Sequence, residues 1–227
     1  MPGEGFTARH RQIGMTATWT VSVLLILYAI TLILGLISLK SHSDPISDPY
    51  FSLLEILILL MMPLMILVMV ALHAYACSET KVYSLTALIM MILATAITSG
   101  VHFVILTISR HDEMNGMPWI SLFLSFKWPS VAYALDILAW DWFFALSLLF
   151  AAPVFKSGRL ELVVRSLMIV SGLLSLAGLL GVPLEDMQIR MIGVAGYVGV
   201  TPILFLLIGI VFKRHRINLP LEVNKIS

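Results

Sequence analysis

The sequence predicts an all-α, polytopic membrane protein: a six-transmembrane-helix bundle in a single domain, residues 1–227, with both termini in the cytoplasm. Hydrophobic residues make up 59% of the chain and charged residues 12%, against about 45–50% and about 25% in soluble globular domains. Long apolar stretches recur along the chain, and Lys and Arg are concentrated in alternate segments between them. Because such a chain has too few polar residues to cover a soluble surface, lipid is the expected solvent.

The six helices are predicted from apolar windows bounded by charge, proline or glycine. A helix needs about 20 apolar residues to cross a hydrocarbon core of about 30 Å. The first window is longer than the apolar core of a signal peptide and lacks a small-x-small cleavage site, so we expect it to remain as a helix. The predicted helices cover residues 16–39, 50–75, 82–108, 130–155, 160–182 and 191–212.

The orientation is predicted from the distribution of Lys and Arg, which favour the cytoplasmic side. With the N-terminus inside, the outer side holds four: Lys40, Arg110, Lys127 and Arg190. The expected location is a plasma membrane, the cytoplasmic membrane of a bacterium or archaeon. The nine cytoplasmic residues are Arg9, Arg11, Lys81, Lys156, Arg159, Lys213, Arg214, Arg216 and Lys225.

Ionisable residues inside the apolar windows are the candidates for function. A charged side chain at the bilayer centre costs at least about 2.5–3.5 kcal/mol, so such groups face the protein interior. At about 1.5 Å per residue, Glu55 lies about 8 Å below the outer end of its helix, His102 about 12 Å and Asp136 about 10 Å. We therefore expect these three side chains to meet in the outer half of the bundle.

Helical spacing adds neighbours to this set. Ser99 and His102 lie on one polar stripe of the third helix, and Tyr133 and Asp136 share a face of the fourth helix. Asp141 is turned about 140° from Asp136 in an α-helix and lies near the midplane. The two aspartates are therefore not expected to form a side-by-side pair, and we expect Asp141 to act as a separate midplane step.

Asp141 then needs a partner of its own. Arg165 is too near the cytoplasm, whereas Tyr28 and Tyr197 lie closer to the depth of Asp141. The choice between such a partner and a bound proton is left open by the sequence.

Three interpretations of the buried polar set remain open. The leading hypothesis is a small-molecule or proton-linked transporter or channel, because carboxylate and imidazole chains move charge across membranes. The second is a non-catalytic accessory or scaffold protein, in which the buried acids only hold helices together. The third is a metal-dependent intramembrane enzyme using one His and two carboxylates. The binding or proton-relay candidates are Glu55, His102, Asp136, Asp141, Ser99 and Tyr133.

No motif assigns catalysis, a metal or a cofactor. HxxH, HxxxH and ExxH spacings do not accompany His102. Ser99 lies three residues from His102, but no strand-to-helix elbow surrounds it, so we name no catalytic residue. A net charge of +1 without a basic block excludes nucleic acid as an expected partner.

Small residues recur every three or four positions in the last two predicted helices, which lets helix backbones approach closely. These faces serve either packing within the chain or contact with a second copy or another membrane protein; the lipid bilayer is the other expected partner. The residues are Ser171, Ser175, Gly178 and Gly181, with Gly193, Gly196 and Gly199.

Two further features have open interpretations. The aromatic outer segment 111–129 is either an interfacial anchor or a lid over an outer cavity. Pro63 in the second helix and Pro202 in the sixth are each either a tolerated kink or a hinge.

Overall fold

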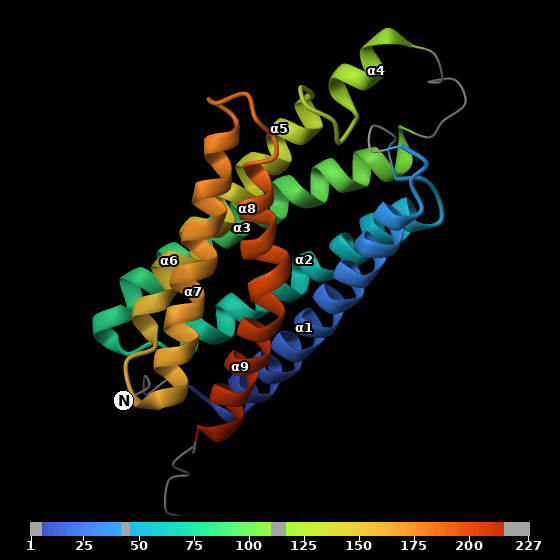
Figure 1. The fold of residues 1–227 in the computed structure, drawn as a ribbon. Coiled ribbons are helices and arrows are strands. Elements are labelled where there is room, and N and C mark those ends of the chain that lie inside the picture. The colour runs from blue at the N-terminus through green and yellow to red at the C-terminus, as the bar shows by residue number, and fades with distance from the viewer. Residues whose placement is uncertain (1–5, 42–45, 110–116, 216–227) are drawn as a thin grey trace, which may run out of the picture.

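The protein is a bundle of long helices (Figure 1). The computed structural model describes residues 6–41, 46–109 and 117–215, and these residues contain helices without strands. The predicted all-α class is therefore confirmed for the described chain. Six helical runs are long and apolar enough to cross a membrane: Ala8–Ile37, Tyr50–Tyr75, Ser78–Thr107, Val131–Val154, Gly158–Gly181 and Arg190–Arg214.

The first three spans are regular α-helices. α1 covers Ala8–Ile37 and α2 covers Tyr50–Tyr75. A short 3-10 turn, Ser78–Thr80, leads into α3, Lys81–Thr107. A six-residue helix outside the spans, α4, covers Pro118–Phe123.

The fourth and sixth spans each contain a π-helical segment, in which hydrogen bonds join residues five apart. The fourth span consists of α5 (Val131–Ile137), the π segment η3 (Leu138–Phe144), α6 (Ala145–Ala151) and the 3-10 turn Ala152–Val154. The fifth span is α7 (Gly158–Gly178) with the 3-10 turn Leu179–Gly181. The sixth consists of α8 (Arg190–Val194), the π segment η6 (Ala195–Val200) and α9 (Thr201–Arg214).

α1 begins eight residues before the predicted window because its first turns are polar. Thr7 caps the helix: its hydroxyl accepts a hydrogen bond from the backbone N–H of His10 at 3.3 Å, and the His10 ring bonds the backbone of Thr7 in return. Such a cap satisfies N–H groups that lack partners in the first turn. The apolar window thus marks the hydrophobic part of α1, and the cap marks where the helix starts.

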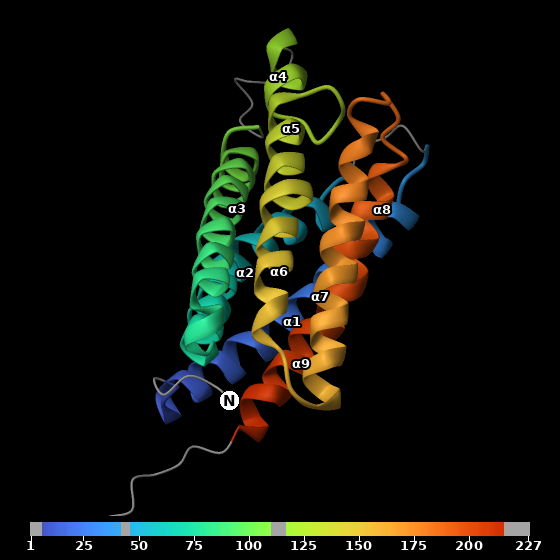
Figure 2. The same ribbon diagram turned by 90° about the vertical axis from the view of Figure 1, so that its left-hand side faces the viewer.

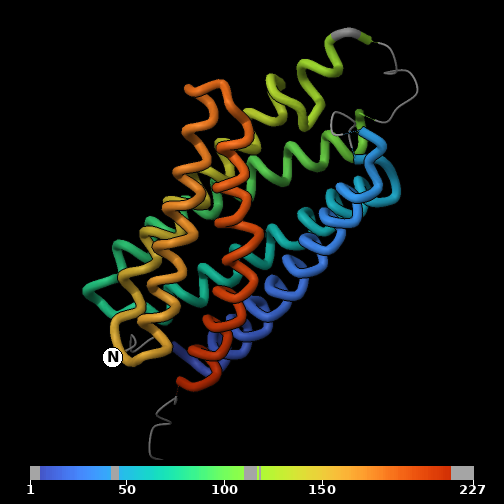
Figure 3. The backbone as a smooth tube through the Cα atoms, viewed as in Figure 1, coloured from blue at the N-terminus to red at the C-terminus, as the bar shows by residue number. Residues whose placement is uncertain are grey.

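Helices adjacent in the chain are also neighbours in space. α1 packs on α2, α2 on α3, α3 on the fourth span, the fourth span on α7, and α7 on the sixth span, while α9 packs on α1 (Figures 1 and 2). The described parts of the two termini lie at the same end of the bundle, where Phe6 and Phe212 have ring centroids 5.6 Å apart (Figure 3). We call this the terminal end and the opposite one the distal end.

The core between the spans is apolar and rich in methionine. Met61, Met65, Met69 and Met91 are fully buried with Phe144 in one cluster, so the methionine runs pack the bundle. The helices also accommodate both prolines: α2 continues through Pro63, which is exposed, and Pro202 is the second residue of α9, in its first turn. Ser22 of α1 donates to the carbonyl of Pro202 at 2.7 Å and ties these helices together.

Candidate functional site

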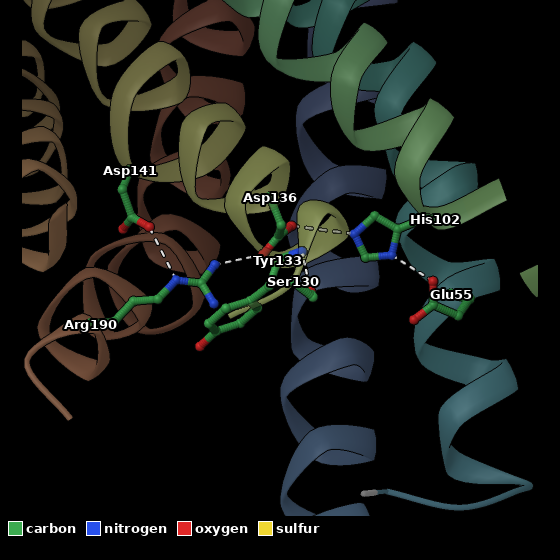
Figure 4. Close-up of polar contacts among 7 residues, drawn as sticks. All are labelled: Glu55, His102, Ser130, Tyr133, Asp136, Asp141 and Arg190. Atoms are coloured by element: carbon green, nitrogen blue, oxygen red, sulfur yellow. Dashed lines mark hydrogen bonds and ion pairs between the residues drawn. The ribbon is translucent and has the colours of Figure 1, made fainter. Parts of the chain in front are cut away.

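Five charged or ionisable side chains form a continuous row across the distal half of the bundle (Figure 4). Glu55 Oε2 lies 2.7 Å from His102 Nδ1, and His102 Nε2 lies 3.5 Å from Asp136 Oδ1. Arg190 Nη2 donates to Asp136 Oδ2 at 2.5 Å, and Arg190 Nε donates to Asp141 Oδ2 at 3.2 Å. We call these five residues the charge row; acids and bases alternate along it.

Four spans supply the charge row. Glu55 comes from α2, His102 from α3, Asp136 and Asp141 from α5 and η3, and Arg190 from the first position of α8. The structure therefore brings together the three side chains that depth alone placed at one level, Glu55, His102 and Asp136. It joins them to the sixth span, which the depth estimate did not include.

Every member of the charge row is buried. The exposed fractions are 0% for Asp141, 3% for Glu55, 5% for His102, 7% for Arg190 and 8% for Asp136. Removing a charge from water costs several kcal/mol, and only close pairing offsets that cost. Each of these groups therefore depends on its neighbours in the row to remain inside the bundle.

The expectation that Asp141 stands apart from Asp136 was wrong. Both carboxylates bind the same guanidinium, that of Arg190. The reason is the π segment that begins at Leu138: its wider turn brings residues five apart to nearly the same face, whereas an α-helix separates them by about 140°. Isolated π turns are often found at functional sites.

Arg190 is the residue that the sequence prediction missed. The predicted sixth helix began at residue 191, which left Arg190 in the outer loop and Asp141 with Tyr28 or Tyr197 as candidate partners. In the structure Arg190 opens α8 and its long side chain reaches inward. One signal was available: three carboxylates at membrane depth need a nearby cation, and Arg190 adjoins an apolar window at the matching depth.

Of the two remaining candidates, Tyr133 contacts the charge row and Ser99 does not point into the core. The guanidinium of Arg190 lies 4.3 Å from the ring centroid of Tyr133, a cation–π distance. Ser130 caps α5 by accepting from the backbone N–H of Tyr133 at 3.1 Å. Ser99 is only half-buried, and Thr98 instead occupies the buried position one turn from His102. The interior face of α3 is thus rotated slightly from the predicted stripe.

Two spaces lie along the bundle, one on each side of the charge row. On its terminal side, a narrow apolar gap of about 150 Å³ separates α2, α3 and the fourth span and has no room for water. On its distal side, Phe126 covers His102, with ring centroids 5.1 Å apart. A pocket of about 300 Å³ opens among Ser121, Leu122, Ser125, Lys127, Trp128 and Pro129. Residues 111–116 of the segment predicted as anchor or lid lie outside the described chain.

A metal centre is not supported by the arrangement of the described residues. Among them, no group of three or more His, Cys, Asp or Glu side chains could hold a metal ion. Arg190 lies between Asp136 and Asp141, so a cationic side chain already fills the place between these two carboxylates.

The net charge of the row determines whether it favours binding of a further proton or cation. It contains three carboxylates, one guanidinium and one imidazole. With every acid ionised, one negative charge remains if His102 is protonated, and two remain if it is neutral. Because an uncompensated buried charge is strongly unfavourable, the row must take up at least one further proton or cation.

Comparison with known proteins gave no significant match to a protein-family model, a curated protein or a solved structure.

Proposed function

We propose that this protein is a proton-linked transporter or channel in which the charge row is the proton-binding site. The observation that carries the proposal is the excess of buried carboxylates over bases in the row. A row of alternating acids and bases lets a proton taken up at one group change the pairing of the next. Groups that served only to hold helices together would need no such excess.

The surroundings of the row support a path along the bundle. The apolar gap adjoins Thr98, one turn from His102, and continues past Thr95 towards the terminal end. Its other walls include Met65 and Trp140. We propose that this dry gap is the closed part of the path and that it separates the row from the terminal side.

The proposed orientation places the distal end outside the cell and both termini in the cytoplasm. Arg190 is buried in the bundle, so it no longer counts among the outer loop charges. Three residues, Lys40, Arg110 and Lys127, then remain outside, against nine inside. This greater asymmetry supports the orientation, because cytoplasmic loops carry the excess of Lys and Arg.

The test is proton flux into proteoliposomes under an imposed pH gradient, reported by a pH-sensitive dye inside the vesicles. We expect wild-type protein to dissipate the gradient. His102→Gln and Asp136→Asn should each slow flux by about a hundredfold, the scale of a lost proton-transfer group. The matched control is His73→Gln, because His73 bonds Ser84 at the terminal end at 2.8 Å and lies outside the row.

The control should retain wild-type flux, and thermal unfolding in detergent must show that each variant is folded. Wild-type vesicles no more permeable to protons than empty ones would overturn the proposal. Equal flux in folded His102→Gln and wild type would do the same, and either result would leave the row with a structural role.

A further inference from the structure

Asp141 is the most completely buried member of the charge row and the least well paired. Its Oδ2 accepts one bond from Arg190 at 3.2 Å. Its Oδ1 is buried and has no hydrogen-bond partner among the described residues. An ionised carboxylate has two oxygens and about four acceptor sites, so one contact leaves most of its hydrogen-bonding capacity unused.

The unpaired oxygen lies in a notch made by two glycines, one on α7 and one on α8. A Cβ on Gly178 would lie 2.8 Å from the Cα of Gly193 and 3.0 Å from Asp141 Oδ1, and a Cβ on Gly193 would collide with the same oxygen. Only glycine at both positions leaves room for the carboxyl group. The small residues were expected to allow a close helix contact, and here that contact also leaves space for Asp141 Oδ1. We call the space between Gly178 and Gly193 the glycine notch.

A second buried polar atom without a partner lies on the same seam. Ser175 precedes Gly178 by one turn on α7, is fully buried, and its Oγ has no hydrogen-bond partner among the described residues. One turn further, Ser171 donates to the carbonyl of Gly196 at 2.9 Å. The two glycines of this seam thus place neutral groups against Asp141 Oδ1, while Arg190 contacts Oδ2.

The other two carboxylates of the row are better stabilised as anions. Asp136 accepts from Arg190 at 2.5 Å and lies 3.5 Å from His102 Nε2, while Glu55 pairs with His102 Nδ1 at 2.7 Å. The net negative charge of the row calls for one further proton. We expect that proton on Asp141, because Asp141 is the acid with the least hydrogen-bonding support as an anion.

We propose that Asp141 is protonated in the resting protein and stores a proton in the glycine notch. A carboxylic acid needs far less stabilisation than a carboxylate in a neutral, buried site. The titratable groups that act on it directly are Arg190 from α8, Asp136 from α5 and Tyr197 from η6. Tyr133 and His102 lie one contact further away, against Arg190 and Asp136 respectively. α7 contributes Gly178 to the same space.

Storage of a proton at Asp141 would control the rest of the row through Arg190. Protonated Asp141 leaves the guanidinium to Asp136, whereas ionised Asp141 competes for it and weakens the Arg190–Asp136 pair. Asp136 would then depend more on His102. The state of one buried acid is in this way coupled to the His102–Glu55 pair at the far end of the row.

Infrared spectroscopy of the purified protein tests the inference, because a protonated carboxyl group has a C=O stretch distinct from that of a carboxylate. We expect a buried carboxylic-acid band at neutral pH that is lost in Asp141→Asn and retained in Asp136→Asn. Asparagine resembles the protonated acid in shape, so Asp141→Asn should keep the wild-type Tm. Absence of the band from wild type, or its persistence in Asp141→Asn, would overturn the inference.

A glycine pair tests where the proton lies. Gly178→Ala should shift the carboxylic-acid band because the new methyl group contacts Oδ1, whereas Gly199→Ala should not, since Gly199 has open space around it. A band unmoved by Gly178→Ala would overturn the placement in the notch. If Asp136→Asn does not fold, Glu55→Gln replaces it as the variant that must retain the band.

The storage role rests on the proposed proton movement, but the protonation of Asp141 is measured without it. Wild-type protein with the band and without flux would overturn the proposed function and leave the proton on Asp141. Flux without the band would overturn the inference and leave the proposed function.

Discussion

The two ends of the bundle use the same kinds of side chain in different ways. At the terminal end, Glu161 accepts from the Tyr75 hydroxyl at 2.7 Å and from the backbone N–H groups of Lys156 and Ser157 at 3.0 and 2.9 Å. Both of its oxygens have donors, and it stands in the first turn of α7, where an acid is favoured. At the distal end, three acids share two bases, and one buried oxygen has no donor among the described residues.

Exposure separates the two ends further. Lys156 pairs with Glu79 at 2.9 Å, but the side chains are 44% and 79% exposed. The hydrogen bond and charge of Glu79 raise the pKa of Lys156, so the pair favours the charged amine. Ion pairs as exposed as this one contribute little to the free energy of unfolding. Polar groups at the terminal end hold the helices in place, whereas the charge row retains an imbalance that a mobile proton can resolve.

Arg190→Met should have the largest effect, because it removes the cation that two buried acids share. Leaving the buried charge of Asp136 without this partner costs about 3–5 kcal/mol. We expect a large fall in Tm in detergent, with Arg190→Lys falling less because one ammonium still reaches a carboxylate. Arg165→Met is the control, since Arg165 is exposed on α7. If Arg190→Met matched the control, Asp136 and Asp141 would both have to be neutral in the absence of the guanidinium.

The sequence was sufficient for one part of the charge row and not for the other. Glu55, His102 and Asp136 were predicted to meet because depth along a helix follows from residue count alone. Asp141 was predicted to stand apart near the midplane and Arg190 to lie in the outer loop. Their positions in the row depend on departures from regular geometry: a π segment changes the angle between Asp136 and Asp141, and a long side chain carries Arg190 inward from a helix end. The six apolar helices follow from composition, whereas a π turn depends on packing between spans, such as that of Trp140 on Tyr197 at 5.2 Å.

Tyr75→Phe tests whether the polar groups of the terminal end are only structural. It removes one hydrogen bond to a charged group, worth about 1.5 kcal/mol, while the ring keeps its contacts with Phe6 and Phe212. We expect a modest fall in Tm and unchanged proton flux. Tyr83→Phe, at an exposed position of α3, is the control. A loss of flux in folded Tyr75→Phe would mean that the terminal end also takes part in proton movement.

The smallest effect concerns His215, whose ring packs against the edges of Phe6 and Tyr75 at 5.3 and 5.6 Å between centroids. Burial, and then the positive charge of Arg11, lower the pKa of His215 from its ordinary value. Because the fold favours the neutral ring, its stabilising contribution is present above the ordinary pKa of about 6.5 and is lost as the pH falls through the lowered value. Thermal unfolding between pH 8 and pH 5 should therefore show a component of acid destabilisation that His215→Gln removes. If His215→Gln left the pH profile of Tm unchanged, the acid sensitivity would come from other groups, and the terminal end would contribute to stability without titrating in this range.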